Sequence, residues 1–137
     1  MALHIVKLCV GAEGVAALAA FQKGQIKQRG APVCGTRMWP KRAEEVLAGG
    51  SLYWVFKGVI LARQRITRID QVKDAHGLRC GLWLDAEIVR TAPQPRRAFQ
   101  GWRYLDPKDA PADLAALGGA ENLPEALRRQ LVELGAW

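Results

Sequence analysis

A regular alternation of apolar and polar residues between positions 78 and 88 restricts the fold of this chain most. Alternate positions are apolar: Leu78, Cys80, Leu82, Leu84, Ala86 and Ile88. The positions between them include Arg79, Trp83, Asp85 and Glu87. Successive side chains of a strand point to opposite faces of the sheet, so this pattern predicts a strand over residues 78–88. One face of that strand must meet a core.

A β-hairpin is predicted just before this strand, with its turn at Lys57-Gly58. The first strand covers residues 51–57, and its even positions are large and apolar. A tight turn at this place keeps apolar residues opposite each other and moves the arginines of the second strand to the far end. The expected opposite pairs are Phe56 with Val59, Trp54 with Leu61, and Leu52 with Arg63.

Helical and extended segments alternate along the rest of the chain. We expect a strand over residues 3–10, a helix over 12–28, an extended piece over 33–38 and a short helix from Pro40 to Gly49. A proline-bracketed loop is expected from Pro93, and a helix is expected to start at Asp106-Pro107. Residues 122–125 resemble a capping box, which predicts a last helix with an apolar stripe of Leu127, Leu131 and Leu134. These elements predict an α+β fold whose mostly antiparallel sheet is open or barrel-like, with helices at its ends.

The length of 137 residues favours one domain over residues 1–137. No apolar run approaches the roughly 20 residues that span a bilayer, and the first ten residues fit a strand better than an export signal. The three cysteines are widely spaced, which favours reduced thiols in a cytoplasmic protein over a metal or redox centre. We therefore expect no metal, no cofactor and no membrane partner.

The formal charge of +7 is concentrated in two segments. Residues 36–68 carry seven cations and two anions, and residues 90–103 carry four arginines and no acid. Nine of these eleven cations are arginine. Clustering of this kind favours a phosphate-bearing or polyanionic partner. The alternative is a scattered and solvated basic surface.

The first candidate site is the start of the predicted short helix. Arg37 precedes it, and Lys41 and Arg42 occupy its expected first turn beside Trp39. Cations at a helix start are repelled by the positive end of the helix dipole, whereas a bound phosphate would be attracted by the cations and by the dipole. The alternative is that these cations pair with Glu44 or Glu45 along the helix.

The second candidate site is the arginine set Arg63, Arg65 and Arg68 on the long second strand of the hairpin. Arg63 and Arg65 are two positions apart and should project from the same side of the sheet. Guanidinium groups grip phosphate with two parallel hydrogen bonds and stack on bases. The alternative is that they are charges that protect an exposed edge strand.

The third candidate site is the run "PQPRRAFQGWRY", which combines arginines with aromatic rings. Unpaired bases stack on exposed rings, and arginine neutralises the nucleic-acid backbone. Burial of at least one of the two aromatic residues after Gly101 is the competing expectation. The candidates in this run are Arg96, Arg97, Phe99, Arg103, Trp102 and Tyr104, and the further rings that would line the same surface are Trp39, Tyr53 and Trp83.

Signals for catalysis are sparse, because the chain has no nucleophile elbow, phosphate-binding loop, dinucleotide fingerprint or metal-ligand spacing. Thr36, Lys41 and a carboxylate at Glu44 or Glu45 form the best catalytic constellation. A structural role for these side chains is the simpler interpretation.

The motifs "LHIVKLCVG", "TRMWPKRAEEVLAGGSLYWVFKGV" and "PRRAFQGWRYL" resemble a small alphaproteobacterial family (domain of unknown function 1489) over essentially the whole chain. The family carries no established activity. The segment "GGSLYWVFKGVILARQRI" after a short helix is also similar to PUA and ASCH-type domains, small β-barrels that bind RNA or modified bases. That likeness implies a ligand cleft near Thr36, Arg37, Trp39, Lys41 and Arg42, and some ASCH-type proteins are amidohydrolases that use Lys, Thr and Glu.

These observations favour an RNA-binding module without catalytic activity, in which the arginines follow the backbone and exposed rings stack on bases. A small ASCH-type hydrolase or nucleoside-binding protein is the first alternative. An adaptor that binds an acidic protein is the second. The sequence does not specify an oligomeric state.

Overall fold

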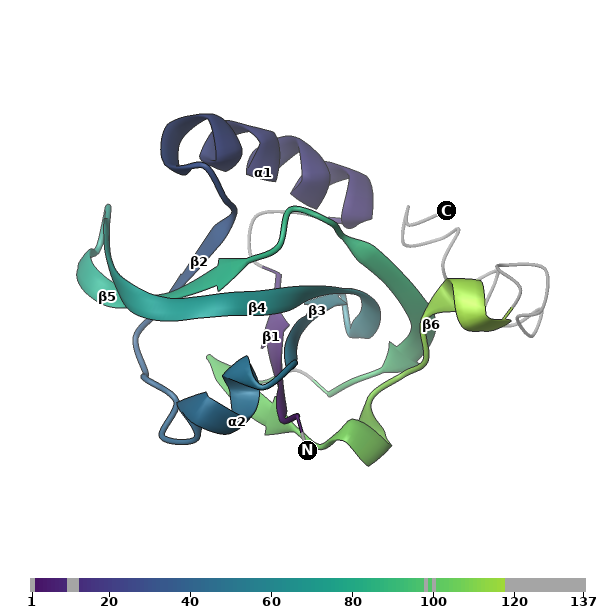
Figure 1. Ribbon diagram of the computed structural model, residues 1–137. Coiled ribbons are helices and arrows are strands. Elements are labelled where there is room, and N and C mark those ends of the chain that lie inside the picture. Colours follow the sequence, from purple (N-terminus) through teal and green to yellow (C-terminus); the bar gives the residue numbers. More distant parts are fainter. Residues whose placement is uncertain (1, 10–12, 98, 100, 118–137) are drawn as a thin grey trace.

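The computed structural model describes residues 2–9, 13–97, 99 and 101–117, and it contains one sheet of seven strands (Figure 1). The strands are β1 (His4–Leu8), β2 (Val33–Thr36), β3 (Ser51–Phe56), β4 (Val59–Asp74), β5 (Gly77–Leu84), β6 (Val89–Pro95) and β7 (Trp102–Leu105). Their order is β2-β5-β4-β3-β1-β7, and β6 pairs with β4. The pair β1–β3 is parallel and the other pairs are antiparallel, which confirms the α+β class and the mostly antiparallel sheet.

The sheet is not closed, so the barrel-like alternative is corrected. The short strands β2 and β7 lie at the two ends of the strand order, and no ladder joins them. Side chains connect these ends instead. The Trp102 indole Nε1 donates to the Met38 carbonyl (2.9 Å), and the Arg42 amide donates to the Tyr104 hydroxyl (3.1 Å). The segment after β2 is thereby attached to β7.

The predicted hairpin forms, with a shifted register. Its turn residues Lys57 and Gly58 have φ of 48° and 84°, as a tight hairpin turn requires, and Phe56 pairs with Val59. A β-bulge at Leu61 then changes the pairing, because one extra residue on β4 opposes the partner strand. Trp54 therefore lies opposite Ala62, Leu52 opposite Gln64, and Tyr53 opposite Arg63, which corrects the expected pairs.

The predicted strand over residues 78–88 ends at Leu84. The Asp85 carboxylate accepts a hydrogen bond from the Glu87 amide (2.9 Å), which forms a local turn at that point. The segment expected to be a proline-bracketed loop contains β6, which pairs with β4 up to Pro95. Pro93 and Pro95, which have no amide hydrogen, fit there because on the side away from β4 the described part of the chain pairs with β6 only around Thr91 and Ala92, through a bridge from Thr91 to Asp113.

The core lies on both faces of the sheet. One cluster is centred on Ile5, Leu52, Trp54 and Phe56, and the smaller cluster on the opposite face includes Val6 and Tyr53. All six residues of β3 are buried because both faces are covered. The alternation of β3 alone predicted only one covered face.

Helix α1 (Val15–Arg29) packs on the larger cluster through Val15 and Leu18 and ends at Gly30, which has φ of 81° (Figure 1). Helix α2 (Ala43–Leu47) is short and buries Val46. A Cβ at Gly50, just after α2, would lie 2.2 Å from the Leu3 carbonyl oxygen, so only glycine allows this approach.

Two 3₁₀ turns, η1 (Pro107–Asp109) and η2 (Leu114–Leu117), complete the described chain. Asp106 caps η1 as predicted, by accepting from the Lys108 amide. The predicted capping box at 122–125 and the leucine stripe after it lie outside the described residues. Within the part that is described, no helix has the length and apolar character that a membrane span needs.

Candidate functional sites

Residues 37–42 form a loop whose shape is set by β7. The Met38 carbonyl accepts from both Trp102 Nε1 (2.9 Å) and the Thr36 hydroxyl (3.0 Å), while Tyr104 holds the Arg42 amide. Trp102 and Tyr104 are two residues apart on β7 and therefore reach this loop from the same face of the strand. These two hydrogen bonds join residues that are 62 and 64 positions apart, so the loop connects the first basic segment to β7.

The tip of this loop is open to solvent. Met38 and Trp39 are 55% and 48% exposed. Arg37 and Lys41 are exposed and make no hydrogen bond or ion pair with any described residue. An exposed indole therefore lies between two cations without carboxylate partners.

The predicted phosphate site at the helix start is not formed, because α2 begins at Ala43 and not at Pro40. Its first turn contains Glu44 and Glu45. The Arg42 guanidinium binds Glu45 with two hydrogen bonds of 2.5 and 2.7 Å and lies 5.7 Å from the centre of the Tyr104 ring. The hydrogen bond from Arg42 lowers the pKa of Glu45, so the alternative of cation pairing along the helix holds for Arg42.

On the other face of β7, Arg103 lies opposite Val6 of β1. Its guanidinium is 5.4 Å from the centre of the Phe99 ring, and that of Arg96 is 6.0 Å from the same ring. Phe99 packs on the smaller core cluster, and its ring makes cation–π contacts with both arginines. We call Arg96, Arg103 and the exposed Arg97 the cationic ridge.

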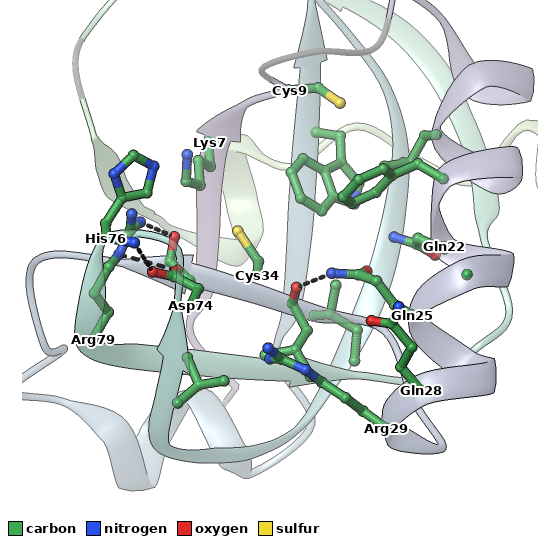
Figure 2. A pocket seen from close by; sticks show the side chains of 18 of the residues that line it. Lys7, Cys9, Gln22, Gln25, Gln28, Arg29, Cys34, Asp74, His76 and Arg79 are labelled. Carbon is green, nitrogen blue, oxygen red and sulfur yellow. Dashed lines mark hydrogen bonds and ion pairs between the residues drawn. The ribbon is translucent and has the colours of Figure 1, made fainter.

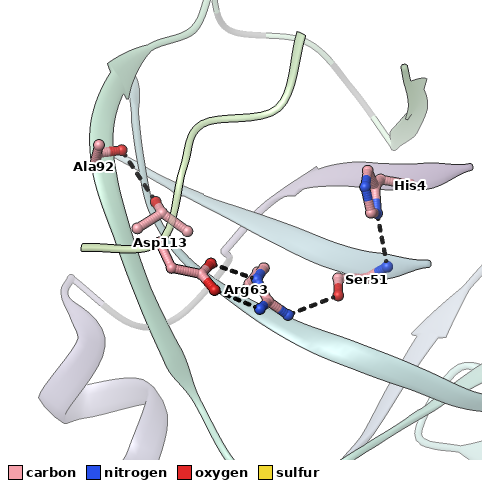
Figure 3. Close-up of polar contacts among 6 residues, drawn as sticks. His4, Ser51, Arg63, Ala92 and Asp113 are labelled. Carbon is pink, nitrogen blue, oxygen red and sulfur yellow. Dashed lines mark hydrogen bonds and ion pairs between the residues drawn. The ribbon is translucent and has the colours of Figure 1, made fainter. Parts of the chain in front are cut away.

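Arg63 is held in a polar network on the sheet (Figure 3). Its Nε and Nη2 donate to the two carboxylate oxygens of Asp113, both at 2.7 Å, and its Nη1 donates to the Ser51 hydroxyl (3.1 Å). The hydrogen bond from Arg63 lowers the pKa of Asp113. These donors are directed at Asp113 and Ser51, so Arg63 is poorly placed to bind a nucleic-acid backbone.

The two other arginines on β4 have different surroundings. Arg65 is exposed, and its guanidinium has no hydrogen-bond or ion-pair partner among the described residues. The Arg68 guanidinium covers the Trp83 ring at 4.0 Å, and its Nε lies 4.0 Å from Asp70. Trp83 is consequently half-buried and its Nε1 makes no hydrogen bond within the described chain.

Most rings expected to stack on bases are covered. Tyr53 and Trp102 are each 4% exposed, which corrects the predicted exposure of Tyr53 and confirms that one ring after Gly101 is buried. Trp39 alone among the predicted stacking rings is classed as exposed in the described chain. The candidate surface therefore depends on one indole and its surrounding cations.

The residues expected to line a catalytic cleft have different surroundings in the described chain. Thr36 is buried, and its hydroxyl donates to the Met38 carbonyl. Glu44 is exposed, and Tyr53 lines a shallow pocket of about 330 Å³ with His4, Arg63 and Asp113. This geometry gives the combination of Thr36, Lys41 and Glu44 no nucleophile open to solvent.

A larger pocket of about 770 Å³ lies between α1 and the sheet (Figure 2). Its floor comes from the ends of β1 and β2 and from the β4–β5 hairpin, and α1 forms the opposite wall. The labelled side chains are Lys7, Cys9, Cys34, Asp74, His76 and Arg79 on the sheet side and Gln22, Gln25, Gln28 and Arg29 on the helix side.

Comparison with protein families matches residues 5–137 to a family described as "Protein of unknown function (DUF1489)". The chain belongs to this family. No curated protein and no solved structure matches it.

In this DUF1489 protein, sequence reasoning missed the larger pocket because its lining comes from six separate segments. One signal was present in the sequence. Lys7 follows two apolar residues of β1 and occupies a position whose neighbours Ile5 and Trp54 belong to the larger core cluster. A cation on the inner face of a strand indicates a polar cavity beside it.

Proposed function

We propose that the protein binds single-stranded RNA along the edge of the sheet formed by β7. The contact surface comprises the loop over residues 37–42 on one side of β7 and the cationic ridge of Arg96, Arg97 and Arg103 on the other. The observation that carries the proposal is the pair of hydrogen bonds from Trp102 and to Tyr104, which hold the loop against β7.

The chemistry of this edge fits a flexible polyanion. Arg37, Lys41 and Arg97 are exposed cations without carboxylate partners among the described residues, so they are available to phosphates. Trp39 offers a ring on which a splayed base can stack, a contact worth about 1–3 kcal/mol. The anchored loop is ordered before binding, which lowers the entropic cost of the complex.

The proposal assigns no catalytic step to the protein and keeps the predicted cytoplasmic location. The ASCH-type hydrolase alternative loses support because Thr36 is buried and its hydroxyl is bound to a backbone carbonyl. The adaptor alternative uses the same exposed cations and is separated from RNA binding by the experiment below.

The test is fluorescence anisotropy of a 20-nucleotide labelled RNA, measured with the full chain from low to moderate salt. Affinity for the wild type should fall steeply with salt. Trp39→Ala should weaken binding about 5-fold to 150-fold, the loss of one stacked base. Arg37→Gln combined with Lys41→Gln should reduce the salt slope by about 1.4, because two phosphate contacts are lost.

The matched control is Lys23→Gln combined with Lys27→Gln, which removes the same charge from the exposed side of α1. Its salt slope should remain that of the wild type. If the two double variants lost RNA affinity and salt slope equally, net charge alone would drive binding, and the assigned surface would be refuted. Absence of RNA binding together with a nuclease-resistant acidic protein that co-purifies would favour the adaptor.

A further inference from the structure

The pocket beside α1 lies next to β1 and β2, two strands that no ladder joins. Lys7 comes from β1, Cys9 follows the end of β1, and Cys34 and Gly35 come from β2. A volume of about 770 Å³ is in the range of sites that enclose small molecules. The pocket is therefore large enough for a ligand with several rings.

Its charged groups are predominantly cationic. Lys7, Arg29 and Arg79 face a single carboxylate, that of Asp74, among the described lining residues. Lys7 is half-buried, and its ammonium group makes no hydrogen bond or ion pair within the described chain. A half-buried ammonium group without a counter-ion favours an anion close to it.

Arg79 extends the cationic end of the pocket. Its guanidinium donates to the Gly35 carbonyl, and its Nε lies 3.5 Å from an oxygen of Asp74. That Nε is buried and makes no hydrogen bond with a described residue. Arg79 therefore contributes a positive charge at the pocket wall, where Asp74 and the Gly35 carbonyl hold its guanidinium in place.

The thiol of Cys34 lies near both cations and does not neutralise them. Burial raises the pKa of Cys34, and the charges of Lys7 and Arg79 lower it to a smaller extent. The thiol is consequently protonated at neutral pH. The positive charge at this end of the pocket is thus compensated only by Asp74 among the described lining residues.

The remaining walls combine apolar side chains with the amides of Gln22, Gln25 and Gln28. Trp54, Leu18 and Leu84 supply apolar surface. The Gln22 and Gln64 amides bind each other through two hydrogen bonds of 2.8 and 2.7 Å, and Gln64 also accepts from Trp54 Nε1 (2.9 Å). This buried network fixes both the indole and the amide that face the cavity.

The geometry points to a binding site for a small organic anion in this pocket. A carboxylate or phosphate group lies at Lys7 and Arg79, and a flat apolar body lies along Trp54 and Leu18. The site shares no residue with the proposed RNA surface on the β7 edge, so the inference stands independently of that function.

The experiment records nitrogen–proton NMR spectra of the full chain with three probes: benzoate, phenyl phosphate and the neutral isostere benzamide. The indole N–H signals of Trp54 and Trp39 are assigned with the Trp54→Phe and Trp39→Phe variants. At least one of the two anions should shift the Trp54 signal and leave the Trp39 signal in place. Benzamide should bind at least about tenfold more weakly than that anion, because it lacks the charge that Lys7 attracts.

Lys7→Gln should weaken binding of the better anion at least about tenfold, whereas Lys23→Gln on the exposed side of α1 should leave it unchanged. If Lys7→Gln does not fold, the comparison of the anions with benzamide decides alone. Equal binding of the anions and benzamide, no binding of either anion, or shifts confined to Trp39 would overturn the inference. RNA added to the same sample tests the other proposal separately, because it should shift Trp39.

Discussion

Arg63 and Arg37 belong to the same basic segment of the sequence, yet the fold gives them opposite surroundings. Arg63 lies on β4, where Asp113 and Ser51 accept hydrogen bonds from its guanidinium and leave it about one-quarter exposed. Arg37 lies on the anchored loop beside β7 and has no such partner among the described residues. One cation stabilises the fold, and the other is available to a ligand.

The difference is caused by acids that are distant in sequence. Asp113 is 50 residues from Arg63 and reaches it because the chain after β7 returns across the sheet, where Asp113 forms a bridge with Thr91. A high net charge in a segment therefore does not show which of its cations form a binding surface, because some of them pair with distant carboxylates. A surface is identified only when the carboxylates that reach each cation are known.

Replacement of Trp102 gives the largest expected effect, because this residue joins the open edge to the rest of the fold. Trp102→Ala removes a buried ring and should lower the free energy of unfolding by about 3–5 kcal/mol. Trp102→Phe keeps most of the apolar surface and loses the bond to Met38, so about 1 kcal/mol is expected. Chemical denaturation measures both values.

The Phe variant also sharpens the comparison between the two regions. It should weaken RNA binding because the loop is no longer held by the indole, while the Arg63 network remains intact. Unchanged RNA affinity in a stably folded Trp102→Phe protein would show that anchoring of the loop has no role in binding.

Arg63→Ala should destabilise the protein by about 1–3 kcal/mol, between the values for exposed and buried ion pairs, because both side chains are partly exposed. Arg65→Ala, two positions away on the same strand, should change stability by less than about 0.5 kcal/mol. A double-mutant cycle of Arg63→Ala with Asp113→Ala isolates the pair. A coupling energy near zero would mean that Arg63 is as free as Arg65.

Much of the fold followed from the sequence. The alternation of β3 and the turn at Lys57-Gly58 located the hairpin and its Phe56–Val59 pair correctly, and the alternation from Leu78 located β5. The bulge at Leu61 was missed because both Leu61 and Ala62 are apolar, so no polar residue marks the extra position. The start of α2 was misplaced because Pro40 suits a first helical position, whereas the chain first passes through the loop bound to β7.

The candidate sites followed from the sequence less well. Exposed cations at Arg37 and Lys41 were found, since charge is visible in composition. The pairing of Arg63 with Asp113 and the burial of Tyr53 depend on which segments cover a face of the sheet. The pocket at Lys7 depends on how the strands and α1 are arranged around it, and no single segment of the sequence specifies that arrangement.

The smallest expected effect concerns pH and the histidine beside the Arg63 network. His4 Nδ1 accepts a hydrogen bond from the Ser51 amide at 3.0 Å (Figure 3). The His4 ring also meets the Tyr53 ring edge-to-face. Burial lowers the pKa of His4, and the positive charge of Arg63 lowers it further. In the unfolded chain the residue binds a proton near pH 6.5, so stability should fall as pH decreases from about 7.5 to 5.5.

His4→Asn tests this assignment, because its amide oxygen can accept the same hydrogen bond and does not titrate. The decrease in melting temperature between pH 7.5 and 5.5 should be smaller in this variant than in the wild type, by roughly 1–3 °C. His76→Asn, at the exposed β4–β5 turn, is the control and should keep the decrease. Asp113 does not interfere with this measurement. Its pKa is lowered from the ordinary value of 3.8, so its contribution to stability is constant between pH 7.5 and 5.5 and is lost only below about pH 3.8. An equal decrease in His4→Asn and wild type would show that the network holds Arg63 without any link to the protonation of His4.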